Sequence, residues 1–291
     1  MVALDGDHFV IGSDEDSILR IYNRSQTNAP VWQRDFSGFL QLARKAPETD
    51  LEGAARIGEV IYWITSHSRN AEGKERPNRQ RLFATRIIRT PSGFELEPMG
   101  KPCQTLLAAL VAEPRLAAFK LAEAARLSPE QAGALNIEGL AATPSGGLLI
   151  AFRSPVPAGK ALTVPLENPA AVVEGKAPRF GEPVQLDLNG RGVRDLTLDG
   201  GRYSLIAGGV ANKGKFGLFE WNGPGSAPVP KGIEFGKLSP EGLAVAGTSA
   251  AGELLCTSDD SSRRIDDCDC KDLPNPVKQR FRMVTLRPKG T

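Results

Sequence analysis

The sequence is poor in the residues and segments that mark metal-rich, membrane-spanning or nucleic-acid-binding proteins. It has only two histidines, His8 and His67, which excludes a metal centre built mainly from histidines. Among the four cysteines, the Cys268-Asp-Cys270 pair has too few partners for a zinc site. No apolar run approaches the roughly 18 residues of a membrane span. The 36 basic and 34 acidic residues nearly cancel, so we expect neither nucleic acid nor a membrane as partner.

The first residues, MVALDGDHFVIG, lack the basic and apolar regions of a signal peptide. The sequence therefore leaves two cellular locations open, the cytoplasm or an exported protein whose leader has been removed. It also leaves the oligomeric state open.

Glycine and proline are plentiful, with 31 and 22 residues, and indicate many turns. Between these turns the chain repeats itself. Four segments begin with a similar motif, and each is followed by a turn and a short apolar run. The motifs are Asp50-Leu-Glu-Gly-Ala, Asn136-Ile-Glu-Gly-Leu, Val193-Arg-Asp-Leu-Thr and Ser239-Pro-Glu-Gly-Leu; the runs are 60–64, 148–152, 203–207 and 253–257.

Each apolar run is followed by a polar loop and an alternating strand, and three units end with a weaker fourth strand. Units of four antiparallel strands that repeat about every 45 to 55 residues are typical of β-propeller blades. The N-terminal residues 2–36 form another such unit, so five blades are visible and six are possible. The sequence therefore predicts an all-β fold, a single propeller domain over residues 1–291.

Residues 104–134 do not fit the repeat. They contain LLAALVAE and LAAFKLAEAARL, separated by Pro114, and predict a helical hairpin inserted between two blades. Two roles are open for this insertion. It is a lid or partner surface, or it is a helix pair that covers the edge of a blade.

Propeller geometry predicts where functional residues meet. The first strand of each blade lines the central channel and the second runs back beside it, so the start of the first and the end of the second share one face. First strands bring four acids to this face: Glu52, Glu138, Asp195 and Glu241. Second strands and neighbouring residues bring Asp14, Asp16, His67, Arg69, Arg153, Arg194, Asn212, Lys213, Asp259 and Arg263.

Four carboxylates at one narrow mouth repel one another, since two unit charges 4 Å apart cost about 4 kcal/mol at an effective dielectric near 20. Three arrangements relieve this repulsion. Arg69, Arg153, Arg194 and Arg263 pair with the acids in a network that closes the channel. Alternatively, the acids bind a hard cation such as Ca²⁺, which takes oxygen ligands. In the third arrangement, the arginines line a pocket for an anion.

The motifs resemble the bacterial domain-of-unknown-function family 3616 over almost the whole chain. The segments that carry the resemblance are Gly12 to Tyr22, Asp50 to Arg69, Asn136 to Pro155 and Gly192 to Leu196. More distantly, the Asp-x-Glu-Gly pattern is similar to phytase-like esterase propellers and calcium-dependent lactonase propellers. That similarity implies Ca²⁺ held by Glu52, Glu138, Asp195 and Glu241, although lactonase sites mix Asn with acids.

Two functional hypotheses follow. In the first, the protein is a metal-dependent phosphoester or ester hydrolase. His67 or Asp259 acts as the general base, and Arg69 and Arg153, with Arg194 and Arg263 on the same face, hold an anionic substrate. In the second, the propeller is not catalytic and binds a small anion or a peptide at this face and at the helical insert.

Overall fold

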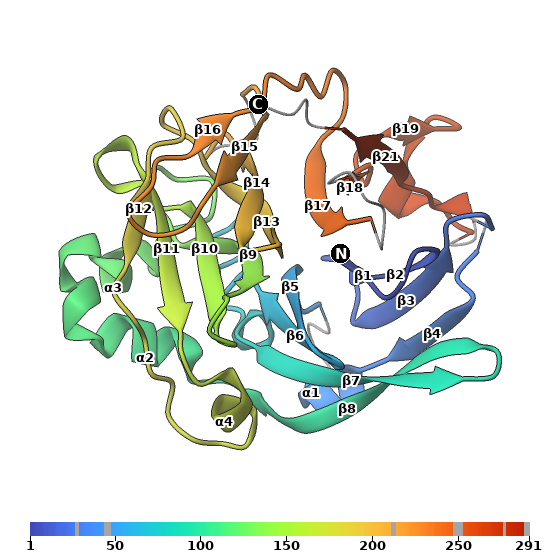
Figure 1. Cartoon of the computed structure of the whole chain (residues 1–291), viewed down its shortest axis with the longest axis horizontal. Helices are drawn as coiled ribbons and strands as arrows, with labels where there is room; N and C mark the ends of the chain where they lie inside the picture. The colour runs from blue at the N-terminus through green and yellow to red at the C-terminus, as the bar shows by residue number, and fades with distance from the viewer. Residues whose placement is uncertain (27–28, 44–47, 211–213, 247–252, 276–277, 288–291) are drawn as a thin grey trace.

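The computed structural model describes residues 1–291 apart from 27–28, 44–47, 211–213, 247–252, 276–277 and 288–291. Within the described residues, five antiparallel sheets stand around a central axis (Figure 1). The predicted all-β propeller is therefore confirmed, and it has five blades in this part of the chain. No helix among the described residues is long and apolar enough to cross a membrane.

Four blades have four strands each, paired in chain order. The fifth blade has three, and a separate hairpin follows its second strand. Blade 1 contains β1 (Val2–Ala3), β2 (His8–Ile11), β3 (Ile18–Asn23) and β4 (Trp32–Asp35); blade 2 contains β5 (Leu51–Ile57), β6 (Val60–Thr65), β7 (Leu82–Thr90) and β8 (Gly93–Cys103). Blade 3 contains β9 (Asn136–Ala142), β10 (Leu148–Ser154), β11 (Ala161–Leu166) and β12 (Val184–Leu186); blade 4 contains β13 (Gly192–Asp199), β14 (Arg202–Gly208), β15 (Gly217–Trp221) and β16 (Val229–Pro230). Blade 5 contains β17 (Pro240–Val245), β18 (Leu254–Ser258) and β21 (Arg282–Leu286), and the hairpin is β19 (Arg264–Ile265) with β20 (Cys268–Asp269).

The second strands are apolar on both faces because each blade is covered by a neighbour on either side. Residues 61–65 of β6 and 148–152 of β10 are all buried. Strands buried on both faces read as continuous apolar runs, which explains why these segments stood out in the sequence. The outer strands alternate instead, as in β8, whose odd positions Glu95 and Glu97 are exposed.

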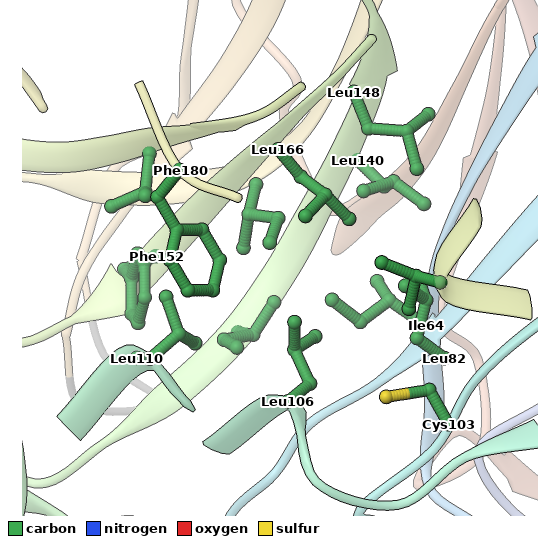
Figure 2. Close-up of a cluster of buried hydrophobic side chains, with 14 of the residues drawn as sticks. Ile64, Leu82, Cys103, Leu106, Leu110, Leu140, Leu148, Phe152, Leu166 and Phe180 are labelled. Carbon is green, nitrogen blue, oxygen red and sulfur yellow. The ribbon is translucent and has the colours of Figure 1, made fainter. Parts of the chain in front are cut away.

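The helical insertion completes the core between blades 2 and 3. It forms α2 (Leu106–Ala112), a 3₁₀ segment (Pro114–Phe119) and α3 (Leu121–Ala124). Leu106 and Leu110 are fully buried and lie in one cluster with Ile64 and Phe152 from the two blades (Figure 2). Two short helices, α1 (Ser37–Leu40) and α4 (Pro169–Val173), pack against β8. Leucines of the insertion therefore pack against both of these blades.

The first strands of all five blades surround the central channel (Figure 1). A cavity of about 430 Å³ in this channel is lined by residues of β1, β5, β9, β13 and β17. Its walls are mostly small and apolar, with Ala54, Ala141 and Ala244 among them. Neighbouring first strands are in contact all the way round, and β1 meets β17 where the ring closes. The four cysteines are free thiols.

Candidate functional site

A β-bulge near the start of four first strands positions the candidate site. In each strand the pairing with the second strand skips one residue, which is then unpaired and has its side chain redirected. In β5, for example, Leu51 pairs with Thr65 and Gly53 with Ile64, so the skipped residue is Glu52. The skipped residues in β5, β9, β13 and β17 are Glu52, Glu138, Arg194 and Glu241. The channel end therefore carries three glutamates and one arginine at equivalent positions.

This arrangement corrects the prediction that Asp195 is the fourth acid. Asp195 follows the bulge and is equivalent to Gly53, Gly139 and Gly242. Its buried carboxylate accepts hydrogen bonds from the N–H groups of Leu196 at 2.8 Å and Leu243 at 2.6 Å. Burial raises the pKa of Asp195 to about 7. Asp195 therefore links blade 4 to blade 5, and it does not face the other acids as a metal ligand.

Two arginines neutralise two of the glutamates. Arg153 Nη1 lies 2.8 Å from Glu138 Oε1, and Arg194 Nε lies 3.0 Å from Glu138 Oε2. Asn136 Nδ2 donates to the same Glu138 Oε1 at 2.9 Å. Arg194 also pairs with Glu241. Residues from three blades thus form a network of acids and arginines with Arg194 as its central cation, and of the four arginines predicted for such a network it contains Arg153 and Arg194.

A second group of acids lies beside this network without such compensation. Glu52, Asp14 and Asp259 form no ion pair with any residue that the structure describes. Burial, followed by the charges of Glu138, Asp50 and Asp14, raises the pKa of Glu52 well above its ordinary value. Burial and the nearby Asp259 raise the pKa of Asp14 to about 7. We call Glu52, Asp14, Asp50 and Asp259 the acidic cluster.

Asp50 is the one member of the acidic cluster with a cationic partner. Arg79 Nη1 lies 2.9 Å from its Oδ2. Burial nevertheless raises the pKa of Asp50, against the effect of Arg79. The sequence contains a signal for this residue, because Asp50 opens the Asp50-Leu-Glu-Gly motif, but nothing in the sequence pointed to Arg79.

The four residues predicted to bind Ca²⁺ do not fit that ion. Glu138 and Glu241 are paired with guanidinium groups, and Asp195 is bound to backbone amides. Glu52 alone is left to supply free carboxylate oxygens, whereas Ca²⁺ takes about six to eight oxygen ligands. Over the described residues, no group of three or more His, Cys, Asp or Glu side chains is arranged to hold a metal.

His67 and Arg69 face a different cavity from the one predicted. They line a pocket of about 170 Å³ together with Leu107 and Arg126 of the insertion, and none of the channel carboxylates lines it. Arg69 Nε donates to the Ala125 carbonyl at 3.0 Å, and its Nη2 pairs with Glu75 at 2.8 Å. The chain reverses at His67, whose φ is 55°, and this turn carries both side chains away from the channel end.

Of the two residues predicted after the second strand of the last blade, Asp259 and Arg263, one lies at the site. Asp259 belongs to the acidic cluster, and its carboxylate accepts the N–H of Ser261 at 2.8 Å. Arg263 is exposed and lies 3.9 Å from Asp260, which is already paired with Arg282 at 2.6 Å. Arg263 is therefore not part of the site. Asp16 pairs with Arg20 at 2.6 Å. Asn212 and Lys213 lie outside the described residues.

Comparison with known proteins identifies a family. A family model described as "Protein of unknown function (DUF3616)" matches residues 1–91 and 95–240. No curated protein sequence matches the chain at a significant level.

Solved structures give distant similarities. A protein of unknown function from Bacteroides caccae is 12% identical with a TM-score of 0.38, and the match covers 96% of this chain and 72% of that one. A sialidase from Trypanosoma rangeli is 11% identical with a TM-score of 0.45, covering 88% of this chain and 42% of the sialidase. The chain therefore spans less than half of the sialidase. At these values the similarities carry no inference about function.

Proposed function

The chain belongs to the DUF3616 family of proteins of unknown function, and we propose that it is a non-catalytic binding propeller. Its ligand carries a cationic group, an ammonium or a guanidinium, on a small molecule or a peptide. This group enters the channel end and pairs with the acidic cluster. The proposal keeps the peptide-binding hypothesis from the sequence and reverses the expected charge of the ligand.

The observation that carries the proposal is the kind of polar atom left free at the channel end. Arg153 and Arg194 are paired with glutamates, so an anion would have to break those ion pairs. The Glu52 carboxylate has no ion pair among the described residues, and the buried Oδ1 of Asn136 has no hydrogen-bond partner there. Both atoms are acceptors. An ammonium group, which has three donors and no acceptor, complements them.

Matched ligands test the sign of the charge. We expect N-acetyl-lysine amide to bind more tightly than N-acetyl-norleucine amide, which lacks only the ammonium, and than N-acetyl-glutamate amide. Isothermal titration calorimetry at low ionic strength measures the three affinities. Glu52→Gln keeps the side-chain shape and removes its charge, and it should weaken binding of the lysine derivative by about tenfold or more.

Glu97→Gln is the control, because Glu97 is an exposed glutamate on the outer strand β8. It should leave the affinity unchanged. Preferential binding of the glutamate derivative, or equal loss in both variants, would contradict the proposal. Ca²⁺ binding that Glu52→Gln abolishes would also contradict it and would favour the metal site predicted from the sequence.

A second candidate is an ester or phosphoester hydrolase that uses two carboxyl groups and no metal. The specific observation in its favour is Asp14, whose pKa is raised to about 7 by burial and by Asp259. A carboxyl with a raised pKa can act as a general acid, and in this candidate Asp259 is the general base. Hydrolysis of nitrophenyl esters that Asp259→Asn abolishes and Glu97→Gln preserves would favour this candidate over simple binding.

A further inference from the structure

A small pocket lies between the β6–β7 connection and the helical insertion, outside the channel. Its volume is about 170 Å³, and its polar lining includes His67, Arg69, Arg76, Gln80 and Arg126, with Leu107 as an apolar wall. The residues come from the turn after β6 and from both ends of the insertion. No residue of the acidic cluster contributes to it.

The tautomer of His67 is fixed by its neighbours. Its Nδ1 lies 2.7 Å from the Thr65 carbonyl oxygen, which only accepts hydrogen bonds, so the ring proton is on Nδ1. The other nitrogen, Nε2, therefore presents a lone pair. The ring is 2% exposed, and Nε2 has no hydrogen-bond partner among the described residues. Burial lowers the pKa of His67 to about 4, so the ring is a neutral acceptor at neutral pH.

His67 is also held in a demanding backbone conformation. Its φ of 55° lies in the left-handed region, which a residue other than glycine adopts at a cost. The His67 N–H donates to the Arg79 carbonyl at 2.9 Å, and the Ser66 N–H donates to the Asp50 carbonyl at 2.9 Å. These bonds fix the turn, and His67 lines the pocket. A buried acceptor presented in this way requires a donor.

The electrostatic character of the pocket complements an anion. Arg69 is paired with Glu75, the one acid in the lining. Arg76 and Arg126 form no ion pair with the part of the chain that the structure describes. Three guanidinium groups against one carboxylate leave the lining with an excess of positive charge. Guanidinium groups suit carboxylate and phosphate oxygens because their donors form a planar fork.

We propose that this pocket binds a small oxyanion that also carries a hydroxyl group, either a phosphate or a hydroxycarboxylate. Arg76 and Arg126 bind the anionic oxygens, and the hydroxyl donates to His67 Nε2. The site is independent of the channel, since it shares no residue with the acidic cluster and takes a ligand of opposite charge.

Inorganic phosphate and sulfate provide a test that needs no variant. The two ions have similar shape, but phosphate keeps a proton at neutral pH and sulfate does not, so only phosphate can donate to His67. We expect calorimetry to give about three- to tenfold tighter binding of phosphate, the effect of one neutral hydrogen bond. Lactate and propionate make the same comparison for carboxylates, because they differ in the hydroxyl. A preference within only one pair identifies which of the two anions the pocket takes.

Three variants locate the binding. His67→Asn tolerates the left-handed backbone and removes the ring acceptor, so it should abolish the preference for phosphate over sulfate. Arg76→Gln and Arg126→Gln should each weaken binding of phosphate or lactate several-fold. Arg86→Gln, an exposed arginine on β7, is the control and should change nothing. Equal affinities within both pairs in the wild type, or binding that survives both arginine substitutions, would overturn the proposal. The arginine variants decide the outcome if His67→Asn fails to fold.

Discussion

Asp14, Asp50 and Glu52 differ from ordinary surface acids because burial and like charges raise the pKa of their carboxyl groups. Asp14 has a raised pKa of about 7 against an ordinary value of 3.8. Between these two values the folded protein holds a proton on Asp14, whereas the unfolded chain has released it. The contribution of Asp14 to the free energy of unfolding is therefore greatest below pH 3.8 and decreases as the pH rises toward 7.

Asp14→Asn should remove this dependence, because the amide is neutral at every pH. Relative to the wild type, we expect the variant to be more stable at alkaline pH by about 1 to 2 kcal/mol, after allowing for the partial solvent exposure of Asp14. The difference should vanish in acid, where the wild-type carboxyl is protonated in both states. Urea denaturation at several pH values measures it. Asp199→Asn, at an exposed aspartate ending β13, should show no comparable trend.

The sequence predicted several of the residues at the channel end, and its misplacement of Asp195 has a definite cause. Glu52, Glu138 and Glu241 meet there, as predicted. The prediction aligned Asp195 with these glutamates because it is acidic. However, Leu140 and Leu243 each lie two positions after their glutamate, and Leu196 matches them in the register of the strands. That register assigns the fourth position to Arg194. Because Asp195 is acidic like the three glutamates, the alignment of the motifs was wrong by one residue in β13.

At the scale of the strand, the bulge is followed by a position where neighbouring blades pack closely. A Cβ atom added to Gly139 would lie 2.6 Å from Leu196 Cδ2 and 2.9 Å from Ala151 Cβ. At Gly53 it would lie 3.0 Å from the backbone N of Leu140. Glycine therefore lets adjacent first strands pack together. At the same position in β13, Asp195 accepts the N–H of Leu243 instead.

Gly139→Ala should consequently destabilise the protein by roughly 1 to 3 kcal/mol, because the added methyl group overpacks the junction of blades 3 and 4. Gly6→Ala is the matched control, since no atom lies within 4 Å of its added Cβ. Thermal or urea unfolding of both variants measures the difference. If the two substitutions had equal effects, close packing at the bulge would not explain why glycine occurs there.

The elements themselves could be predicted well where one blade repeats the pattern of another. The paired strands were recognised because blades bury their second strands on both faces. The positions of His67 and Arg69 could not be predicted in the same way. Both follow β6, as expected, but no motif in the sequence marks the left-handed turn at His67, and the contact of Arg69 with Ala125 depends on the insertion, which has no counterpart in the other blades.

At the scale of the whole molecule, the ring closes without a sheet shared between its two ends. Strands of blade 1 pair with one another, and those of blade 5 do likewise, so the junction is made by the contact of β1 with β17 and by apolar side chains that include Phe9 and Leu255. Strand β1 is short, with Val2 and Ala3 as its paired residues. Arg56 of blade 2 reinforces it, donating to the carbonyls of Ala3 at 3.2 Å and Leu4 at 2.7 Å.

This junction should therefore be the place where the ring opens most readily. Opening between blades 1 and 5 exposes the small cluster of Met1, Phe9, Ala244, Ala246 and Leu255. Opening between blades 2 and 3 exposes a larger cluster, which includes the leucines of the insertion. In native-state hydrogen exchange, we expect amides of β1 and β17 to exchange faster than those of β9 and β10. Arg56→Gln should accelerate exchange in β1 and leave β10 unchanged, because it removes the support of the Ala3 and Leu4 carbonyls. Uniform exchange across all five blades would mean that the ring opens only by global unfolding, and the junction would then have no special role in its stability.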